Sequence, residues 1–194
     1  AVPRGLIKVN APLGFGRSHI APALSEFARK QPHVEVQLQL TDRPLPLVEE
    51  SMDVGIRFGD APDTRLVARR IAPNRRLLCA SPAYLKRRGA PKTPADLARH
   101  DCLVYSSVQG DDVWQLTDRK GKPSTVRVAG RFRSNNLSAL LEATRRGLGV
   151  AILPNYVAHV SLARGDIVRA MTDYALPAQE IHAVFPSPKL VPAK

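Results

Sequence analysis

A glycine-rich turn near the N-terminus carries the first residues that could bind a small molecule. Residues 11–16 follow a strand-like run at 6–9 and lead, through Arg17 and Ser18, into a helical pattern. Glycines let a backbone approach a ligand closely, and the start of a helix attracts anions. Arg17 and Ser18 would add a charge and a hydroxyl for a carboxylate. A plain strand-to-helix turn would use the same glycines, so both interpretations stay open.

Two further polar groups stand where strands are expected to end or helices to begin. Ser106 and Ser107 follow a strand-like run at 102–105, at the edge where open α/β sheets bind ligands. Residues 134–136, Ser-Asn-Asn, precede a helical pattern and could supply an N-cap with spare amides for an anion. No general base accompanies the serines, so they favour hydrogen bonding to a ligand over nucleophilic attack.

Catalytic chemistry has weak support. His100-Asp101-Cys102 unites a base, a carboxylate and a thiol, but Cys102 begins an apolar strand, which favours a buried, inert thiol. The five histidines lack metal-ligand spacing, and Gly14-x-Gly16 lacks the third glycine of a dinucleotide fingerprint. We therefore expect no enzyme activity, no metal and no cofactor.

The elements that must position these residues alternate as in an α/β fold. Strands bounded by turns and helical patterns indicate a parallel α/β sheet that is repeated in a second half of the chain. The predicted strands are residues 6–9, 34–40, 53–58, 76–80, 102–105, 150–153 and 181–185, with a hairpin at 114–116 and 125–129. One predicted helix is residues 46–52. The other predicted helices follow the turn at 11–16 (with Ile20, Leu24 and Phe27 on one face), Ser81, Thr93 and residues 134–136.

Local cap signals support several of these helices. Ser81-Pro82 is typical of an N-cap with proline in the first helical position, and Gly89 would end that helix. Thr93 and Asp96 have the spacing of a capping box. Gly147 suits a left-handed C-cap.

Composition excludes several classes of protein. The chain has 194 residues, 44% of them hydrophobic and 24% charged, which is typical of a globular protein with one domain or two small lobes. The longest uncharged stretch, residues 147–163, is interrupted by Pro154, Asn155 and His159 and predicts no membrane span. Two cysteines make neither a disulfide framework nor a zinc cluster, and no signal peptide is evident, so we expect a cytoplasmic protein.

The net charge of +12 is concentrated in the middle of the chain. Residues 61–170 hold 20 basic and 8 acidic side chains, whereas positive and negative charges cancel in residues 1–60 and in residues 171–194. Such a surface attracts nucleic acid, acidic partners or anionic ligands. An ordinary solvated surface rich in arginine is the alternative, and no single basic helix or strand indicates a nucleic-acid groove.

Four motifs in order resemble the effector-binding domain of LysR-type transcriptional regulators. They are residues 53–59 (DVGIRFG), 80–85 (ASPAYL), 94–100 (PADLARH) and 147–154 (GLGVAILP). The resemblance implies a fold like that of type II periplasmic binding proteins, with two Rossmann-like lobes joined by two crossover segments near 66–73 and 169–174. Lobe one would be residues 1–72 with 171–194, and lobe two 73–170. The family's N-terminal DNA-binding domain is not expected in this chain.

The resemblance also implies a function. A small, anionic effector would bind in the cleft between the lobes, and the domain would form homodimers or homotetramers. DNA would be bound through the N-terminal domain, and no membrane is involved. A solute-binding protein of a transport system shares the fold and is the alternative. The implied ligand-binding residues are Leu13, Gly14, Phe15, Arg17, Thr41, Phe58, Gly59, Ser106, Ser107, Asn135 and Asn136.

Overall fold

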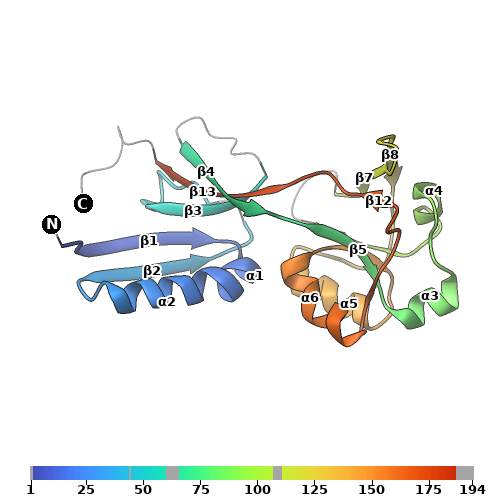
Figure 1. The fold of residues 1–194 in the computed structure, drawn as a ribbon, viewed down its shortest axis with the longest axis horizontal. Coiled ribbons are helices and arrows are strands. Elements are labelled where there is room, and N and C mark those ends of the chain that lie inside the picture. The colour runs from blue at the N-terminus through green and yellow to red at the C-terminus, as the bar shows by residue number, and fades with distance from the viewer. Residues whose placement is uncertain (1, 44, 60–65, 107–110, 187–194) are drawn as a thin grey trace. The chain divides into compact units, whose positions relative to one another are not determined.

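The computed structural model describes residues 2–43, 45–59, 66–106 and 111–186. The chain divides into two compact α/β units (Figure 1). Unit 1 comprises Ala1–Asn74 and Gln179–Lys194, and unit 2 comprises Arg75–Ala178. The chain therefore passes between the units twice, at 74/75 and at 178/179.

Unit 1 is built on a five-stranded mixed sheet. Parallel β1 and β2 pair in register from Gly5 opposite Val34 to Ala11 opposite Leu40, and β3 extends the parallel part. β13 runs antiparallel between β3 and β4. The strands, in the order β2-β1-β3-β13-β4, are Val34–Leu40, Gly5–Ala11, Val54–Phe58, Glu180–Pro186 and Leu66–Pro73.

One continuous helical run connects β1 to β2. It consists of α1 (Leu13–Phe15), a single π-helical turn η1 (Gly16–Ile20) and α2 (Ala21–Lys30). The run follows one face of β1 and β2 (Figure 1). It begins directly after the carboxyl end of β1, so the first turn of this run stands at the edge of the parallel strands.

Unit 2 contains a second five-stranded mixed sheet and a three-stranded sheet. In the first sheet β6 runs parallel to β10 and β9, whereas β5 runs antiparallel to β10 and β11. Its order is β11 (Val168–Arg169), β5 (Arg76–Ala80), β10 (Val150–Pro154), β6 (Cys102–Tyr105) and β9 (Arg133–Ser134). The three-stranded sheet is β12 (Tyr174–Ala175), β7 (Val113–Asp118) and β8 (Pro123–Arg127).

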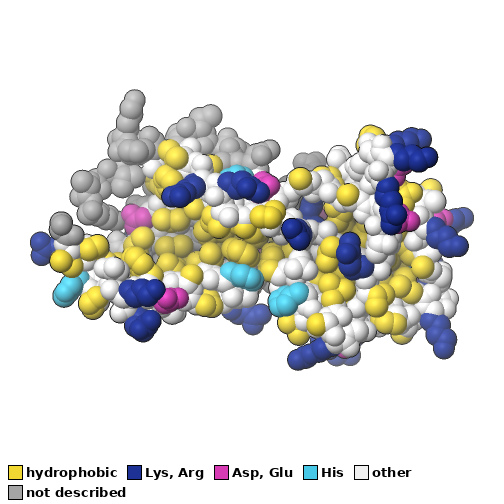
Figure 2. Space-filling model, in the orientation of Figure 1, with side chains coloured by type: hydrophobic (Ala, Val, Ile, Leu, Met, Phe, Trp, Pro, Cys, Tyr) yellow, Lys and Arg dark blue, Asp and Glu magenta, His cyan; other side chains and the backbone are white. Residues whose placement is uncertain are grey.

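Four helices complete unit 2, and two cores hold it together. The helices are α3 (Pro82–Arg88), α4 (Pro94–Leu97), α5 (Leu137–Arg145) and α6 (Asn155–Arg164). One core joins α3, α4 and the three-stranded sheet through Tyr84, Leu97 and Trp114, among others. The other packs α5 and α6 on the large sheet around Leu140 and Leu153. Lys and Arg side chains project along the rim of unit 2, with few acidic side chains among them (Figure 2).

The predicted caps and hairpin are confirmed. The Ser81 side chain accepts a hydrogen bond from the Tyr84 amide at 3.2 Å, and Gly89 ends α3 with a φ of 78°. Thr93 and Asp96 form a capping box at the start of α4. β7 and β8 form the hairpin, with Val113 opposite Arg127. None of the described helices is long and apolar enough to cross a membrane.

Two predictions about local structure are wrong. Residues 46–52 form hydrogen-bonded turns in place of the expected short helix, and Ser51 among them adopts a left-handed φ of 52°. Residues 150–153, expected in a parallel sheet, pair antiparallel with β5 on one side. The crossover predicted near 66–73 lies next to the observed passage at 74/75, and these residues also form β4, which pairs with β13.

The division of the chain also differs from the predicted lobes. Residues 171–178, which the resemblance assigned to lobe one, lie in unit 2, because β12 pairs with β7 there. Helix α6 corresponds to no predicted element.

Candidate functional site

The carboxyl ends of β1 and β2 form the candidate site of unit 1. The Thr41 amide donates to the Ala11 carbonyl at 3.0 Å, which holds the two strand ends together. The Thr41 hydroxyl accepts a hydrogen bond from the Arg43 amide at 3.1 Å. This edge brings Thr41 close to the turn that begins at Leu13, as the strand-end argument predicts.

An acidic side chain occupies part of the predicted anion site. The Asp42 carboxylate accepts a hydrogen bond from the Leu13 amide at 2.9 Å. A carboxylate in this position satisfies one of the amides that a helix start leaves unpaired and interacts favourably with the helix dipole. The Leu13 amide is therefore already hydrogen-bonded and is not free for an effector anion. The expectation that this helix start attracts an anion does not hold for the Leu13 amide.

An aromatic cluster lies behind this edge. Phe15 is buried, and its ring packs edge-on against Phe58 with the centroids 5.5 Å apart. The His19 ring stacks on Phe15 at 4.7 Å with an angle of 8° between the rings. The cluster joins the helical run to β3, so Phe15 and Phe58, two of the predicted site residues, are in direct contact.

The glycines of the turn serve packing more than ligand approach. A Cβ on Gly16 would overlap the Leu40 side chain and lie 3.1 Å from the Ala11 Cβ. The absence of a side chain at Gly16 thus lets the helix sit close to the strands. The Gly14 carbonyl accepts a hydrogen bond from the Ser18 hydroxyl at 2.9 Å, and that hydroxyl also contacts His19 Nδ1 at 2.7 Å. Ser18 is therefore already engaged within the helix.

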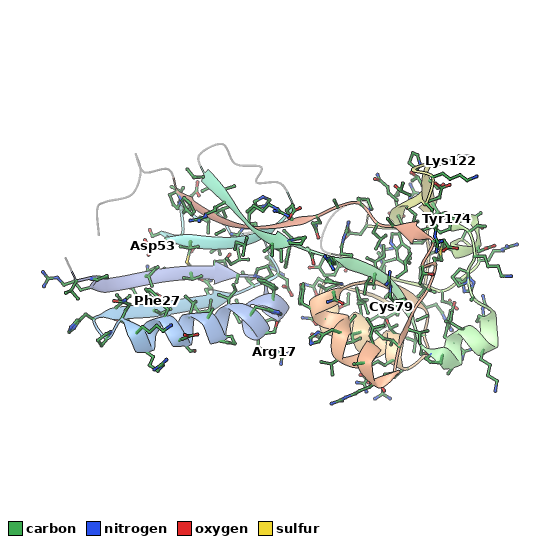
Figure 3. The ribbon with its side chains drawn as sticks, in the orientation of Figure 1. Arg17, Phe27, Asp53, Cys79, Lys122 and Tyr174 are labelled. Atoms are coloured by element: carbon green, nitrogen blue, oxygen red, sulfur yellow. The ribbon has the colours of Figure 1, made fainter. Side chains whose placement is uncertain are left out.

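Arg17 is an exposed cation on η1, the helical turn that follows this edge (Figure 3). Within the part of the chain that the structure describes, it has no carboxylate partner at salt-bridge distance. By contrast, Arg57 on β3 is half-buried and donates to Asn10 Oδ1 at 2.7 Å and to the Leu45 carbonyl at 2.9 Å. Burial lowers the pKa of Arg57. Arg17 remains accessible to a ligand, whereas the guanidinium of Arg57 is used in hydrogen bonds that link β3 to Asn10 and Leu45.

Gly59 ends β3 in a conformation that favours glycine. Its φ is 79°, its amide donates to the Glu180 carbonyl at 2.8 Å, and its carbonyl contacts His182 Nδ1 at 2.9 Å. These contacts tie the end of β3 to β13. Gly59 therefore shapes the edge through the backbone and has no side chain to offer a ligand.

The candidate site of unit 2 lies at the ends of β6 and β9. The Ser106 amide donates to the Ser134 carbonyl at 2.9 Å, and the Ser106 residue is exposed. The Ser134 hydroxyl accepts from the Asn136 amide at 3.1 Å. Asn135 is exposed. Ser106, Asn135 and Asn136 thus share one edge, and Ser107 lies outside the described residues.

Asn136 caps helix α5. Its Oδ1 accepts hydrogen bonds from the Ser138 amide at 3.0 Å and from the Ala139 amide at 3.1 Å. This geometry confirms the predicted N-cap. The Asn136 oxygen is therefore occupied, whereas Ser106 and Asn135 have exposed side chains that can bind a ligand.

The buried thiols have no base beside them. Burial raises the pKa of Cys79 and of Cys102 to about 12, so both are thiols at neutral pH. Cys102 Sγ contacts the Leu97 carbonyl at 3.5 Å, and His100 Nδ1 instead shares a hydrogen bond of 3.0 Å with the Tyr84 hydroxyl. Cys79 lies on β5 within the core (Figure 3). The described residues contain no group of three side chains that could hold a metal.

The profile of the LysR substrate binding domain matches residues 1–194. This chain belongs to that family. The LysR domain is 36% identical to the HTH-type transcriptional activator TtdR of Escherichia coli (strain UTI89) over 187 residues, 96% of this chain and 60% of TtdR. It is 35% identical to the HTH-type transcriptional regulator DmlR of Escherichia coli K12 over 100% of this chain and 62% of DmlR. The chain thus spans about three fifths of these relatives.

Solved structures agree on the fold of this LysR domain. The full-length virulence activator AphB of Vibrio cholerae matches with a TM-score of 0.85 and 26% identity, over 97% of this chain and 64% of AphB. The regulatory domain of CrgA from Neisseria meningitidis matches with a TM-score of 0.81 over 98% of this chain and 93% of that chain, at 24% identity, which shows the fold alone. The predicted family and its periplasmic-binding-protein-like fold are confirmed. These relatives are transcriptional regulators and not solute-binding proteins of transport systems, so they do not favour the transport alternative.

Sequence reasoning missed Asp42 and His19. Asp42 directly follows Thr41 at the end of a predicted strand, so the same strand-end rule could have included it. No local rule indicates that its carboxylate reaches the Leu13 amide, 29 residues away. The stacking of His19 on Phe15 has the i, i+4 spacing of a helix, but the sequence predicted a turn at that point.

Proposed function

We propose that this domain senses a small, anionic organic molecule and controls a DNA-binding segment attached to it. Membership of the LysR family supports the regulatory role. The exposed, unneutralised Arg17 at the carboxyl edge of the unit 1 strands is the observation that carries the anionic character of the ligand. Charge-assisted hydrogen bonds from a guanidinium are among the stronger ways to hold a carboxylate.

The edge of unit 2 at the ends of β6 and β9 offers a ligand neutral hydrogen-bonding groups. Ser106 offers a hydroxyl and Asn135 an amide, and both are exposed at adjacent strand ends. Such groups fix the orientation of a ligand and exclude analogues that cannot pair with them. Leu13, Phe15 and Phe58 would supply apolar contacts from unit 1.

Regulation would follow from a shift between conformations. A ligand that binds one arrangement of the units better than another shifts the population towards it by its difference in affinity. The relatives TtdR and DmlR are named HTH-type regulators, and this chain matches about three fifths of each. We propose that the domain works within a longer regulator that carries a DNA-binding segment and acts in the cytoplasm.

We also propose that the domain assembles as a homodimer or homotetramer. Phe27 on α2 is 38% exposed and Val160 on α6 is 47% exposed, so each unit presents an apolar side chain on a helix surface. Unit 2 holds 17 basic and 8 acidic side chains, whereas unit 1 holds 12 and 9. Contact between unit 1 of one copy and unit 2 of another would avoid repulsion between two basic units.

Titration calorimetry with matched variants tests the ligand site. Ser106→Ala and Asn135→Ala should weaken binding of a stabilising anion about five- to tenfold each, because each removes one hydrogen bond worth about 1 to 1.5 kcal/mol. Thr125→Ala and Asn155→Ala change exposed polar residues on β8 and α6 and should leave the affinity unchanged. Equal affinity in all four variants would remove Ser106 and Asn135 from the site.

A further inference from the structure

Five basic side chains gather where α3 and α4 meet. We name them the α3–α4 basic surface: Lys86, Arg87, Arg88, Lys92 and Arg99, all of them exposed. An Arg88 guanidinium nitrogen donates to the Arg99 carbonyl at 2.9 Å, which joins the end of α3 to the turn after α4. The two helices lie on the same edge of unit 2 (Figure 1). The end of α3 and the turn after α4 thus bring basic side chains from two segments to one edge of unit 2.

Neutral acceptors hold two of these arginines without cancelling their charge. Arg87 donates to the Gly147 carbonyl at 2.8 Å, and its guanidinium lies 5.5 Å from the centre of the Tyr84 ring. Arg88 donates to a carbonyl as well. Among the described residues, neither has a carboxylate at salt-bridge distance. Each guanidinium keeps most of its five N–H donors for another molecule.

A single carboxylate is paired with this surface. Asp96 contacts Arg99 at 2.6 Å. The same carboxylate also accepts from the Lys92 amide at 3.0 Å and the Thr93 amide at 2.8 Å, which commits it to the capping box. The nearby Asp101 lies 4.0 Å from Arg131. The surface therefore keeps a clear positive excess after these pairs are counted.

We propose that the α3–α4 basic surface binds the phosphate backbone of duplex DNA, without sequence preference. Arginine forks match phosphate geometry, and pre-positioned guanidiniums lose less entropy on binding. The most exposed large apolar side chains of the described residues, Val2, Ile71 and Val160, belong to other elements. A protein interface normally has an apolar centre, which the five basic residues do not supply.

The proposal goes beyond the regulatory function assigned above. The LysR relatives named here are HTH-type regulators, so in a longer protein this surface would work close to DNA that another segment already holds. Contacts with the phosphates beside that site would add affinity, and a movement of unit 2 would change them. The sequence alone did not show this surface, because no single helix or strand contains it.

Fluorescence anisotropy with a labelled 30-base-pair duplex and this chain tests the proposal. The salt dependence of affinity reports the number of phosphates neutralised, with a slope of about 0.9 per contact. The triple variant Lys86→Gln, Arg88→Gln, Lys92→Gln should lower the slope of log K against log salt by about 2 to 3. The control Lys120→Gln, Lys122→Gln, Arg164→Gln removes the same charge from exposed positions on the β7–β8 turn and α6. It should lower the slope by less than about 1.

Three results would overturn the proposal. The first is that the parent chain does not bind DNA at low salt. The second is that both triple variants lower the slope equally, which would indicate diffuse charge. The third is that the surface variant binds DNA like the parent but loses binding to polyglutamate, which would indicate an acidic protein as the partner. Unchanged melting temperatures, and an unchanged thermal shift with an effector anion, would show that neither the fold nor the ligand site is affected by the variants.

Discussion

The hydroxyl of Tyr84 offers a sharp test of how the unit 2 core is held together. Tyr84 is 0% exposed. Its hydroxyl accepts from the Asp101 amide at 3.0 Å and shares a second hydrogen bond of 3.0 Å with His100 Nδ1. Tyr84→Phe removes both hydrogen bonds and leaves two groups without a partner. Each hydrogen bond contributes about 1 kcal/mol, and groups left unpaired add a further penalty. The free energy of unfolding should therefore fall by about 2 to 3 kcal/mol.

Urea denaturation, followed by circular dichroism, measures this loss of unfolding free energy. When the protein is heated instead, each kcal/mol corresponds to about 2 to 4 °C for a chain of this size, so the melting temperature should fall by about 4 to 12 °C. Tyr174→Phe is the matched control. Tyr174 is half-buried, and its hydroxyl has no hydrogen-bond partner among the residues described, so its loss should change stability by less than about 0.5 kcal/mol.

A double-mutant cycle separates the two bonds. Tyr84→Phe, His100→Ala and their combination should show a coupling of about 1 kcal/mol, because the Tyr84–His100 bond is lost in each. Burial and the neighbouring Arg88 lower the pKa of His100, which favours the neutral ring at neutral pH. If Tyr84→Phe proves as stable as Tyr174→Phe, the proposed role of this hydroxyl is refuted.

Three further outcomes can be checked in the same preparations. Gly149→Ala should destabilise the chain by about 3 kcal/mol in urea, because a Cβ there would overlap the Asp101 carbonyl oxygen; wild-type stability would contradict this. Cys79 and Cys102 should not react with a thiol reagent at pH 8 in the native state and should both react in urea, since burial raises each pKa to about 12. Hydrogen bonds from the Thr93 and Lys92 amides lower the pKa of Asp96, so its stabilising contribution is present above pH ~4 and is lost as pH falls. Asp96→Asn should therefore destabilise at pH 7 and differ less from the parent in acid, and an equal difference at both pH values would oppose this.

Features set by neighbouring residues were predictable. The Ser81 and Thr93 caps and the Asn136 cap need only a few residues to form, and each has the predicted geometry. The hairpin of β7 and β8 is equally local. Their physical determinants, a side-chain acceptor beside unpaired amides and a short turn, are visible in the sequence itself.

Features that depend on distant pairing were not predictable in the same way. β4 exists because residues 66–73 pair with β13, more than a hundred residues later in the chain. At the candidate site, the strand-end rule pointed to Ser106 and the family resemblance to Thr41, whereas the Asp42 contact with the Leu13 amide depends on how two strand ends come together. The α3–α4 basic surface likewise requires the contact between Arg88 and the Arg99 carbonyl.

A thermal-shift screen tests the central claim most directly. The chain would be heated with small carboxylates, aromatic acids, amino acids and matched neutral amides. A ligand at 100 times its dissociation constant stabilises by about 2.7 kcal/mol, which corresponds to a rise of about 5 to 11 °C. The account predicts such a rise with an anion, and its loss in Arg17→Gln. Stabilisation by the neutral amides alone, or an equal rise in Arg17→Gln, would contradict an anionic effector bound at this edge.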